Sequence, residues 1–212
     1  EPAISEVRAR LTPDLEAERL HLLSNILMRQ QRFDEAIALL NTWRGRQDQS
    51  DWLAYAQYNL GVALVRKGLV TEADPFLTRV GTMESGRREL RSLKDRANLA
   101  LGYAYLQNNQ PQLAKPVLQR VRLDGPFSNK ALLGVGWADA ASGEFQQALS
   151  PWLELRDRNL LDSAVQEAYL AIPYAFAKLN ANAQAAENYE LAIRSFDTET
   201  VNLDASIAEI DD

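Results

Sequence analysis

Small and bulky apolar residues recur along the chain in one fixed arrangement. In five places an alanine stands four residues before a bulky apolar residue, a separation that puts both on one helix face. The pairs are Ala36 with Leu40, Ala73 with Leu77, Ala114 with Leu118, Ala148 with Trp152, and Ala185 with Tyr189. Successive alanines are 37, 41, 34 and 37 residues apart. The sequence therefore predicts five copies of one structural unit.

A second set of positions precedes each alanine by twelve residues. These positions are occupied, in chain order, by Ser24, Gly61, Gly102, Gly136 and Pro173. An apolar residue stands immediately before each of them, and another follows three residues later except at Asp139. Small residues at such positions are typical of two helices that approach closely. Each unit is therefore predicted to be a helix, a short turn and a second helix.

The segments between the two halves of each unit have the composition of tight turns. They read RQQRF, RKGLV, QNNQP, ASGEF and KLNAN. Gly68 and Gly143 suit a left-handed residue after a helix, and Asn109 and Asn180 are the usual substitutes for glycine there. The predicted helix pairs are 13–30 with 33–46, 51–67 with 70–80, 87–108 with 111–122, 127–142 with 145–156, and 161–179 with 182–195. The 41-residue step is explained by GTMESGRRELRSLKDR, which lengthens a loop and the fifth helix.

The third unit resembles the tetratricopeptide repeat (TPR) family, through Leu101, Gly102, Tyr105, Ala114, Leu118 and Pro126. The resemblance covers about residues 13–196, although the other units lack the closing proline. It implies an all-α, right-handed solenoid of five degenerate helix hairpins, with repeats at 13–46, 51–80, 87–122, 127–156 and 161–195. A non-repetitive helical bundle, the competing interpretation, does not explain why the offsets recur in phase.

The last segment, 197–212, is predicted to be a separate partial helix in the same single domain. Leu203, Ile207 and Ile210 would share one apolar stripe, which requires a cover from the fifth hairpin or from residues outside this chain. The segment would be a terminal cap or the severed first helix of a sixth unit. We therefore expect the chain to be a piece of a longer protein.

In the TPR family the first helices line a concave groove that binds peptides or proteins, and the resemblance implies the same site here. On each first helix, residues four apart form a row of side chains, and one such row passes through the residue that follows the small residue. In the last three units that residue is Tyr103, Trp137 and Tyr174, which predicts a stacked aromatic series. Arg96 and Lys130 lie one helical turn before the start of these rows, on neighbouring lines of the helix surface. The groove candidates are Asn25, Arg29, Tyr55, Tyr58, Arg66, Tyr103, Trp137, Tyr174 and Lys178. In the alternative interpretation the three rings only fill gaps between neighbouring repeats.

The carboxylate clamp of some TPR domains is not predicted. Asn25 stands where one clamp asparagine would lie, but His21, Tyr58 and Val62 do not complete the set.

Composition narrows the function further. A net charge of −6 argues against a nucleic-acid partner, and no apolar run has the length of a membrane span. Cysteine is absent and His21 is the only histidine, so the sequence offers no metal site, no cofactor site and no catalytic triad. The basic run from Arg87 to Arg96 is interpreted as a solvated helix face, with an anion-binding site as the alternative.

Two functions remain. The first is a non-enzymatic scaffold that binds a peptide segment or partner protein in its concave groove. The second is a structural spacer, or a self-associating module, within a larger assembly protein. The chain starts without methionine and lacks cysteine, which favours an exported protein, for example in a bacterial periplasm, over a cytoplasmic one.

Overall fold

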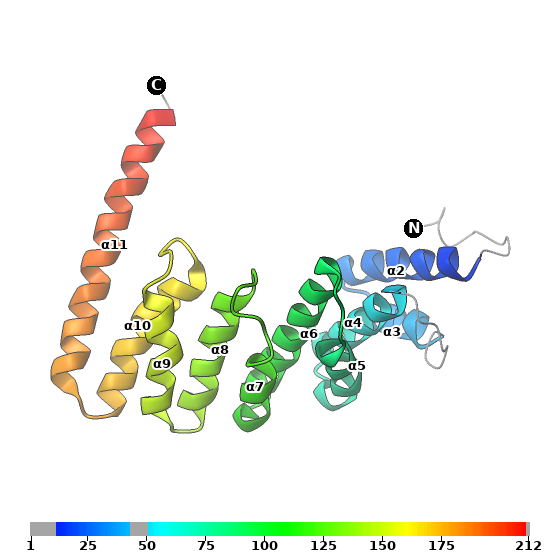
Figure 1. Ribbon diagram of the computed structural model, residues 1–212, viewed down its shortest axis with the longest axis horizontal. Helices are drawn as coiled ribbons and strands as arrows, with labels where there is room; N and C mark the ends of the chain where they lie inside the picture. The colour runs from blue at the N-terminus through cyan, green and yellow to red at the C-terminus, as the bar shows by residue number, and fades with distance from the viewer. Residues whose placement is uncertain (1–11, 43–50, 211–212) are drawn as a thin grey trace.

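A computed structural model of the protein describes residues 12–42 and 51–210, which form ten helices (Figure 1). The helices are α2 (Pro13–Arg29), α3 (Phe33–Asn41), α4 (Asp51–Arg66), α5 (Val70–Thr82), α6 (Arg88–Gln107), α7 (Pro111–Leu118), α8 (Ser128–Ala141), α9 (Phe145–Arg156), α10 (Ser163–Lys178) and α11 (Asn182–Ile210). Consecutive helices form antiparallel hairpins, and successive hairpins stack from α2 at one end to α11 at the other. The predicted all-α solenoid is confirmed.

Glycines and bulky side chains bring the two helices of a hairpin together. A Cβ atom added to Gly61, Gly102 or Gly136 would collide with the side chain of Leu77, Leu118 or Trp152, respectively. Those three side chains are fully buried or nearly so. In these three hairpins the glycine of the first helix therefore receives the residue four positions after the alanine of the second helix, whereas Tyr189 in the fifth hairpin is 44% exposed. This contact is the physical basis of the offsets that recur in the sequence.

The turns between paired helices close with a residue in the left-handed region. Gly68 and Gly143 have φ values of 76° and 81°, and Asn109 and Asn180 have values of 55° and 59°. These four predictions are confirmed. The amide of Gln110 donates to the carbonyl of Tyr105 at 2.8 Å, which satisfies a carbonyl at the end of α6. In the remaining turn the left-handed residue is Gln31, with a φ of 59°. Glutamine is not typical of this conformation, so the sequence did not predict it.

Asp139, the polar exception among the apolar positions, is buried and paired. Lys115 of α7 donates to its Oδ1 at 2.6 Å. Since Lys115 belongs to the third hairpin and Asp139 to the fourth, the ion pair joins neighbouring repeats. A charge in this position is tolerated because its partner is supplied by the previous unit.

The insertion before the third unit extends α6 at its N-terminal end, as predicted. Leu90 and Leu93 are buried there, whereas Arg88 and Arg91 are exposed. Asp95 is fully buried, and Arg122 binds its Oδ2 through Nε at 2.9 Å and Nη2 at 2.7 Å. Arg88 and Arg91 lie on a solvated face, whereas Arg87 forms an ion pair with Asp51. Asp95 fixes the loop that follows α7.

The observed helices differ most from the predicted boundaries in three places. Helix α7 ends at Leu118 rather than at residue 122, and α3 ends at Asn41, with residues 43–46 outside the described part. The two separate helices predicted for 182–195 and beyond 197 are one continuous helix, α11. The hydroxyl of Thr198 donates to the carbonyl of Arg194 at 2.8 Å, as a residue inside a helix does.

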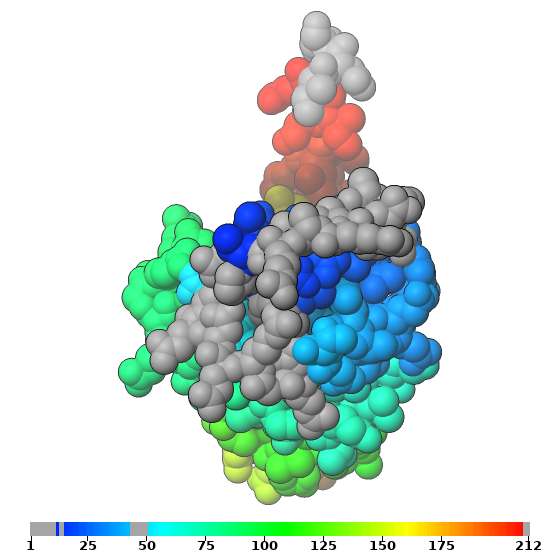
Figure 2. Space-filling model, turned by 90° about the vertical axis from the view of Figure 1, so that its right-hand side faces the viewer, coloured from blue at the N-terminus to red at the C-terminus, as the bar shows by residue number. Residues whose placement is uncertain are grey.

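The end of α11 projects away from the other helices. Figure 2, viewed from the α2 end, shows the red end of α11 rising above the body. Val201, Leu203 and Ile207 are 66%, 44% and 56% exposed. The fifth hairpin therefore does not cover this stripe. The other expectation, that residues outside this chain cover it, stays a prediction. The structure describes neither the side chain of Ile210 nor Asp211 and Asp212.

Candidate functional site

A groove with a volume of about 610 Å³ runs across the first helices of four successive hairpins. It is lined by side chains from α4, α6, α8 and α10, together with Phe127 just before α8. Three of the nine predicted residues line it, namely Tyr58, Arg66 and Tyr103. Four of the five first helices to which the sequence assigned the groove therefore line this cavity, and α2 does not.

Tyr103 is held in the groove by a contact between repeats. Its hydroxyl donates to the backbone carbonyl of Lys130 at 2.8 Å. Its ring lies against Gly134, where a Cβ atom would be 3.2 Å from Cε2. Burial, with a smaller effect from the nearby charge of Glu167, raises the pKa of Tyr103 to about 12. Tyr103 therefore presents a neutral and rigidly oriented ring.

Trp137, Tyr174 and Lys178 form a second cluster next to the groove. The Trp137 ring centroid lies 4.9 Å from that of Trp152 and 6.3 Å from that of Tyr174, and Lys178 Nζ lies 5.4 Å from the Tyr174 ring. The Trp137 indole Nε1 donates to Glu167 Oε1 at 2.6 Å. Because Glu167 lines the groove, it links this cluster to the cavity.

The predicted series of three stacked rings is wrong in one member. Trp137 and Tyr174 are neighbours, but among the described residues no ring contact joins Tyr103 to Trp137. Trp137 also packs edge-on against the buried Trp152. Part of its ring therefore fills space inside its own hairpin, a role that neither interpretation from the sequence had foreseen.

The N-terminal candidates lie apart from the groove. The Asn25 side chain accepts from Asn59 Nδ2 at 2.9 Å and lies 2.9 Å from His21 Nε2. Tyr55 packs on His21 with ring centroids 5.2 Å apart, and the exposed Arg29 does not line the groove. Burial lowers the pKa of His21. These contacts engage both ends of the Asn25 side-chain amide within the protein.

Ten groove residues were absent from the predicted set, and four of these are charged or aromatic. Arg96 and Lys130 lie seven residues before Tyr103 and Trp137, respectively, and Arg96 stacks over the Tyr58 ring at 5.1 Å. Glu167 lies seven residues before Tyr174, so extending the row by two turns would have found it. Phe127 lies outside the helix rows and could not be found from helical spacing.

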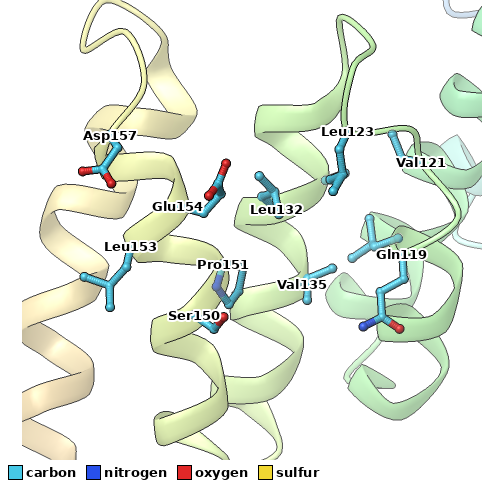
Figure 3. A pocket seen from close by; sticks show the side chains of 12 residues that line it. Gln119, Val121, Leu123, Leu132, Val135, Ser150, Pro151, Leu153, Glu154 and Asp157 are labelled. Carbon is cyan, nitrogen blue, oxygen red and sulfur yellow. The ribbon is translucent and has the colours of Figure 1, made fainter.

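A second cavity, of about 640 Å³, lies between α7 and α9 with α8 beside it (Figure 3). Its apolar side chains include Leu123 and Val135, and its acidic residues are Glu154 and Asp157. Arg158 Nη2 lies 3.1 Å from Glu154, so part of this charge is already neutralised. The first groove is the stronger candidate because its cations have no such partners among the described residues.

The described residues contain neither a candidate metal site nor a candidate membrane-spanning helix. Across 12–42 and 51–210, no three His, Asp or Glu side chains gather as a metal site requires. No helix in the same ranges is long and apolar enough to cross a membrane.

A family model for the tetratricopeptide repeat matches residues 21–78 and 99–158, more than half of the chain. The chain therefore belongs to the TPR family. No curated protein matches it.

Solved structures share the fold at low sequence identity. YrrB, described as a TPR protein with an unusual peptide-binding site, superposes with a TM-score of 0.66 at 21% identity, covering 96% of this chain and 95% of its own. MamA from Desulfovibrio magneticus RS-1 gives 0.66 at 19% identity, covering 84% and 93%. A putative kinesin light chain from Podosopora anserina gives 0.64 at 18% identity, covering 87% and 96%. At these identities the likeness concerns the fold alone.

Proposed function

We propose that this protein is a non-enzymatic scaffold that binds a peptide segment or a partner protein in the groove across α4, α6, α8 and α10. TPR proteins as a family mediate protein and peptide binding. The observation that supports the proposal most is the groove itself, whose two tyrosines already have partners within the protein. Arg96 stacks on Tyr58 and Tyr103 is bonded to the Lys130 carbonyl, so little side-chain freedom remains to be lost on binding.

The composition of the groove also supports a protein partner. Tyrosine and arginine are enriched among the residues that dominate the energy of protein interfaces. Tyr58, Tyr103, Arg66 and Arg96 all line this one cavity. A preformed surface of this kind suits a segment that lies across several repeats.

A displayed library of random linear peptides, selected on the immobilised protein, tests the proposal. Peptides that bind the groove should lose at least about tenfold in affinity, or 1.4 kcal/mol, in Tyr58→Ala and in Tyr103→Ala, the effect of removing an interface hot spot. Tyr189→Ala, an exposed tyrosine on α11, is the matched control and should change nothing. Equal affinity for all three variants would place binding on another surface and contradict the proposal.

The second candidate is a spacer or self-associating module, which the exposed apolar stripe of α11 favours. Light scattering after size-exclusion chromatography, run over a range of protein concentrations, distinguishes the two. A mass that rises with concentration, and returns to one chain when Leu203 and Ile207 are replaced by Ser, would support self-association. A single-chain mass at every concentration would oppose it.

A further inference from the structure

The groove carries excess positive charge in a protein that is acidic overall. Arg66 of α4, Arg96 of α6 and Lys130 of α8 line it, and all three are exposed or partly exposed. Among the described residues, no carboxylate lies within ion-pair distance of any of them. The chain has a net charge of −6, so this local charge runs against the average. Cations in a concave surface without partners of their own are available to a ligand.

Glu167 does not neutralise these cations. It is the one carboxylate among the described residues that line the groove, and it already accepts the Trp137 indole N–H at 2.6 Å. One negative charge against three positive ones leaves the groove positive. The local field therefore attracts acidic segments although the protein as a whole repels them.

Arg96 is placed to receive a carboxylate. Its guanidinium lies 5.1 Å from the centroid of the Tyr58 ring, a stacking contact that leaves the N–H donors at its edge available. A planar guanidinium matches the two oxygens of a carboxylate. Because stacking already restricts the side chain, little further ordering is needed when a ligand binds.

The same groove offers apolar surface beside the charges. Leu99, Tyr103 and Phe127 are half-buried and line it together with Leu133. The hydroxyl of Tyr103 is engaged by the Lys130 carbonyl, so the ring contributes its apolar face. A bulky apolar side chain of a ligand could pack here within reach of the three cations.

We propose that the groove binds an acidic protein segment in which Asp or Glu residues flank a bulky apolar side chain. This inference rests on the function proposed above and adds the chemistry of the partner. The cations come from three different helices, which suits several side-chain carboxylates along a segment rather than one terminal carboxylate. The carboxylates pair with Arg66, Arg96 and Lys130, and the apolar side chain packs against Tyr103 and Phe127.

The experiment uses the same random peptide library and two matched triple variants. The first, Arg66→Gln, Arg96→Gln and Lys130→Gln, removes the groove cations. The second, Arg79→Gln, Arg91→Gln and Arg194→Gln, removes three cations that line neither cavity, so the net charge changes equally. Peptides enriched on the unaltered protein are sequenced, and their affinities are measured by fluorescence anisotropy.

The expected result is an excess of Asp and Glu in the peptides whose binding depends on Tyr58 and Tyr103. Their affinity should fall roughly tenfold in the groove triple variant and stay within about twofold in the control, as three partly exposed ion pairs would give. Replacing the peptide carboxylates by Asn and Gln should reproduce the loss. Shortening the Debye length from about 30 to about 8 Å by adding salt should also weaken binding.

Two other results separate this inference from the proposed function. Peptides that depend on Tyr58 and Tyr103 but show no acidic excess, or bind the groove triple variant equally well, would overturn the inference and leave the function intact. An absence of any peptide that depends on those tyrosines would overturn both.

Discussion

The contact between Gly102 and Leu118 allows a quantitative test of how the repeat is built. Leu118 is 1% exposed, and truncating such a side chain to alanine should cost about 2–5 kcal/mol of unfolding free energy. Gly102→Ala would place a Cβ atom on the Cγ and Cδ2 atoms of Leu118. Leu118 cannot retreat freely, because its Cδ1 also lies against Gly134. Overpacking of this kind costs about 1–3 kcal/mol, offset in part by the roughly 1 kcal/mol by which alanine favours a helix over glycine.

Combining the two changes should recover part of the loss. The methyl group that Gly102→Ala introduces would occupy space that Leu118→Ala vacates, so the double variant should be more stable than the sum of the single effects by roughly 1–2 kcal/mol. The measurement is urea unfolding followed by circular dichroism for the four proteins of the cycle.

A second cycle provides the control. Leu155 is fully buried in α9, within a different core cluster, and does not face Gly102. Gly102→Ala and Leu155→Ala should add within about 0.5 kcal/mol, as distant sites do. If the first cycle is as additive as this control, the glycine does not receive the leucine and the account of the repeat register is refuted.

Three further changes have defined outcomes. Trp137→Ala should lower the melting temperature by less than Leu118→Ala, because the indole is only half-buried, and a larger loss would assign Trp137 to the core. Truncation after Asp197 should change the unfolding free energy of the hairpins by less than about 0.5 kcal/mol, since residues 198–209 are almost all exposed; a clear loss in urea unfolding would show that the segment packs. Arg122→Met should cost roughly 3 kcal/mol in the same assay, because it leaves the fully buried Asp95 without its ion pair, and the additional change Asp95→Asn should restore part of that loss. Equal stability of Arg122→Met and the unaltered protein would show that Asp95 is neutral or solvated.

The architecture was predictable because it depends on short-range offsets. The separation of Gly102 from Ala114 and Leu118 encodes a helix–helix contact directly, and asparagine at 109 and 180 encodes the turn. The continuity of α11 was not predictable, since the run Asp197–Thr198–Glu199 has the composition of a helix start. The helix continues because no turn forms after residue 196, and no short sequence motif indicates whether a turn forms there.

The site was predictable only in part. Helical spacing put Tyr58, Arg66 and Tyr103 on one face, but it could not place Phe127 or show that Glu167 accepts from Trp137. Those relations depend on how one hairpin is rotated against the next. The same rotation separates Tyr103 from Trp137, which the sequence rows had put in one series.

Photo-crosslinking from defined positions tests the central claim most directly. A photoreactive phenylalanine analogue, introduced at Tyr103 in the groove or at Leu123 in the second cavity, is irradiated with a peptide selected on the unaltered protein. Covalent capture is then read by mass spectrometry. The groove account predicts capture of the peptide from position 103 and little from position 123. Capture from position 123 and not from 103 would contradict it.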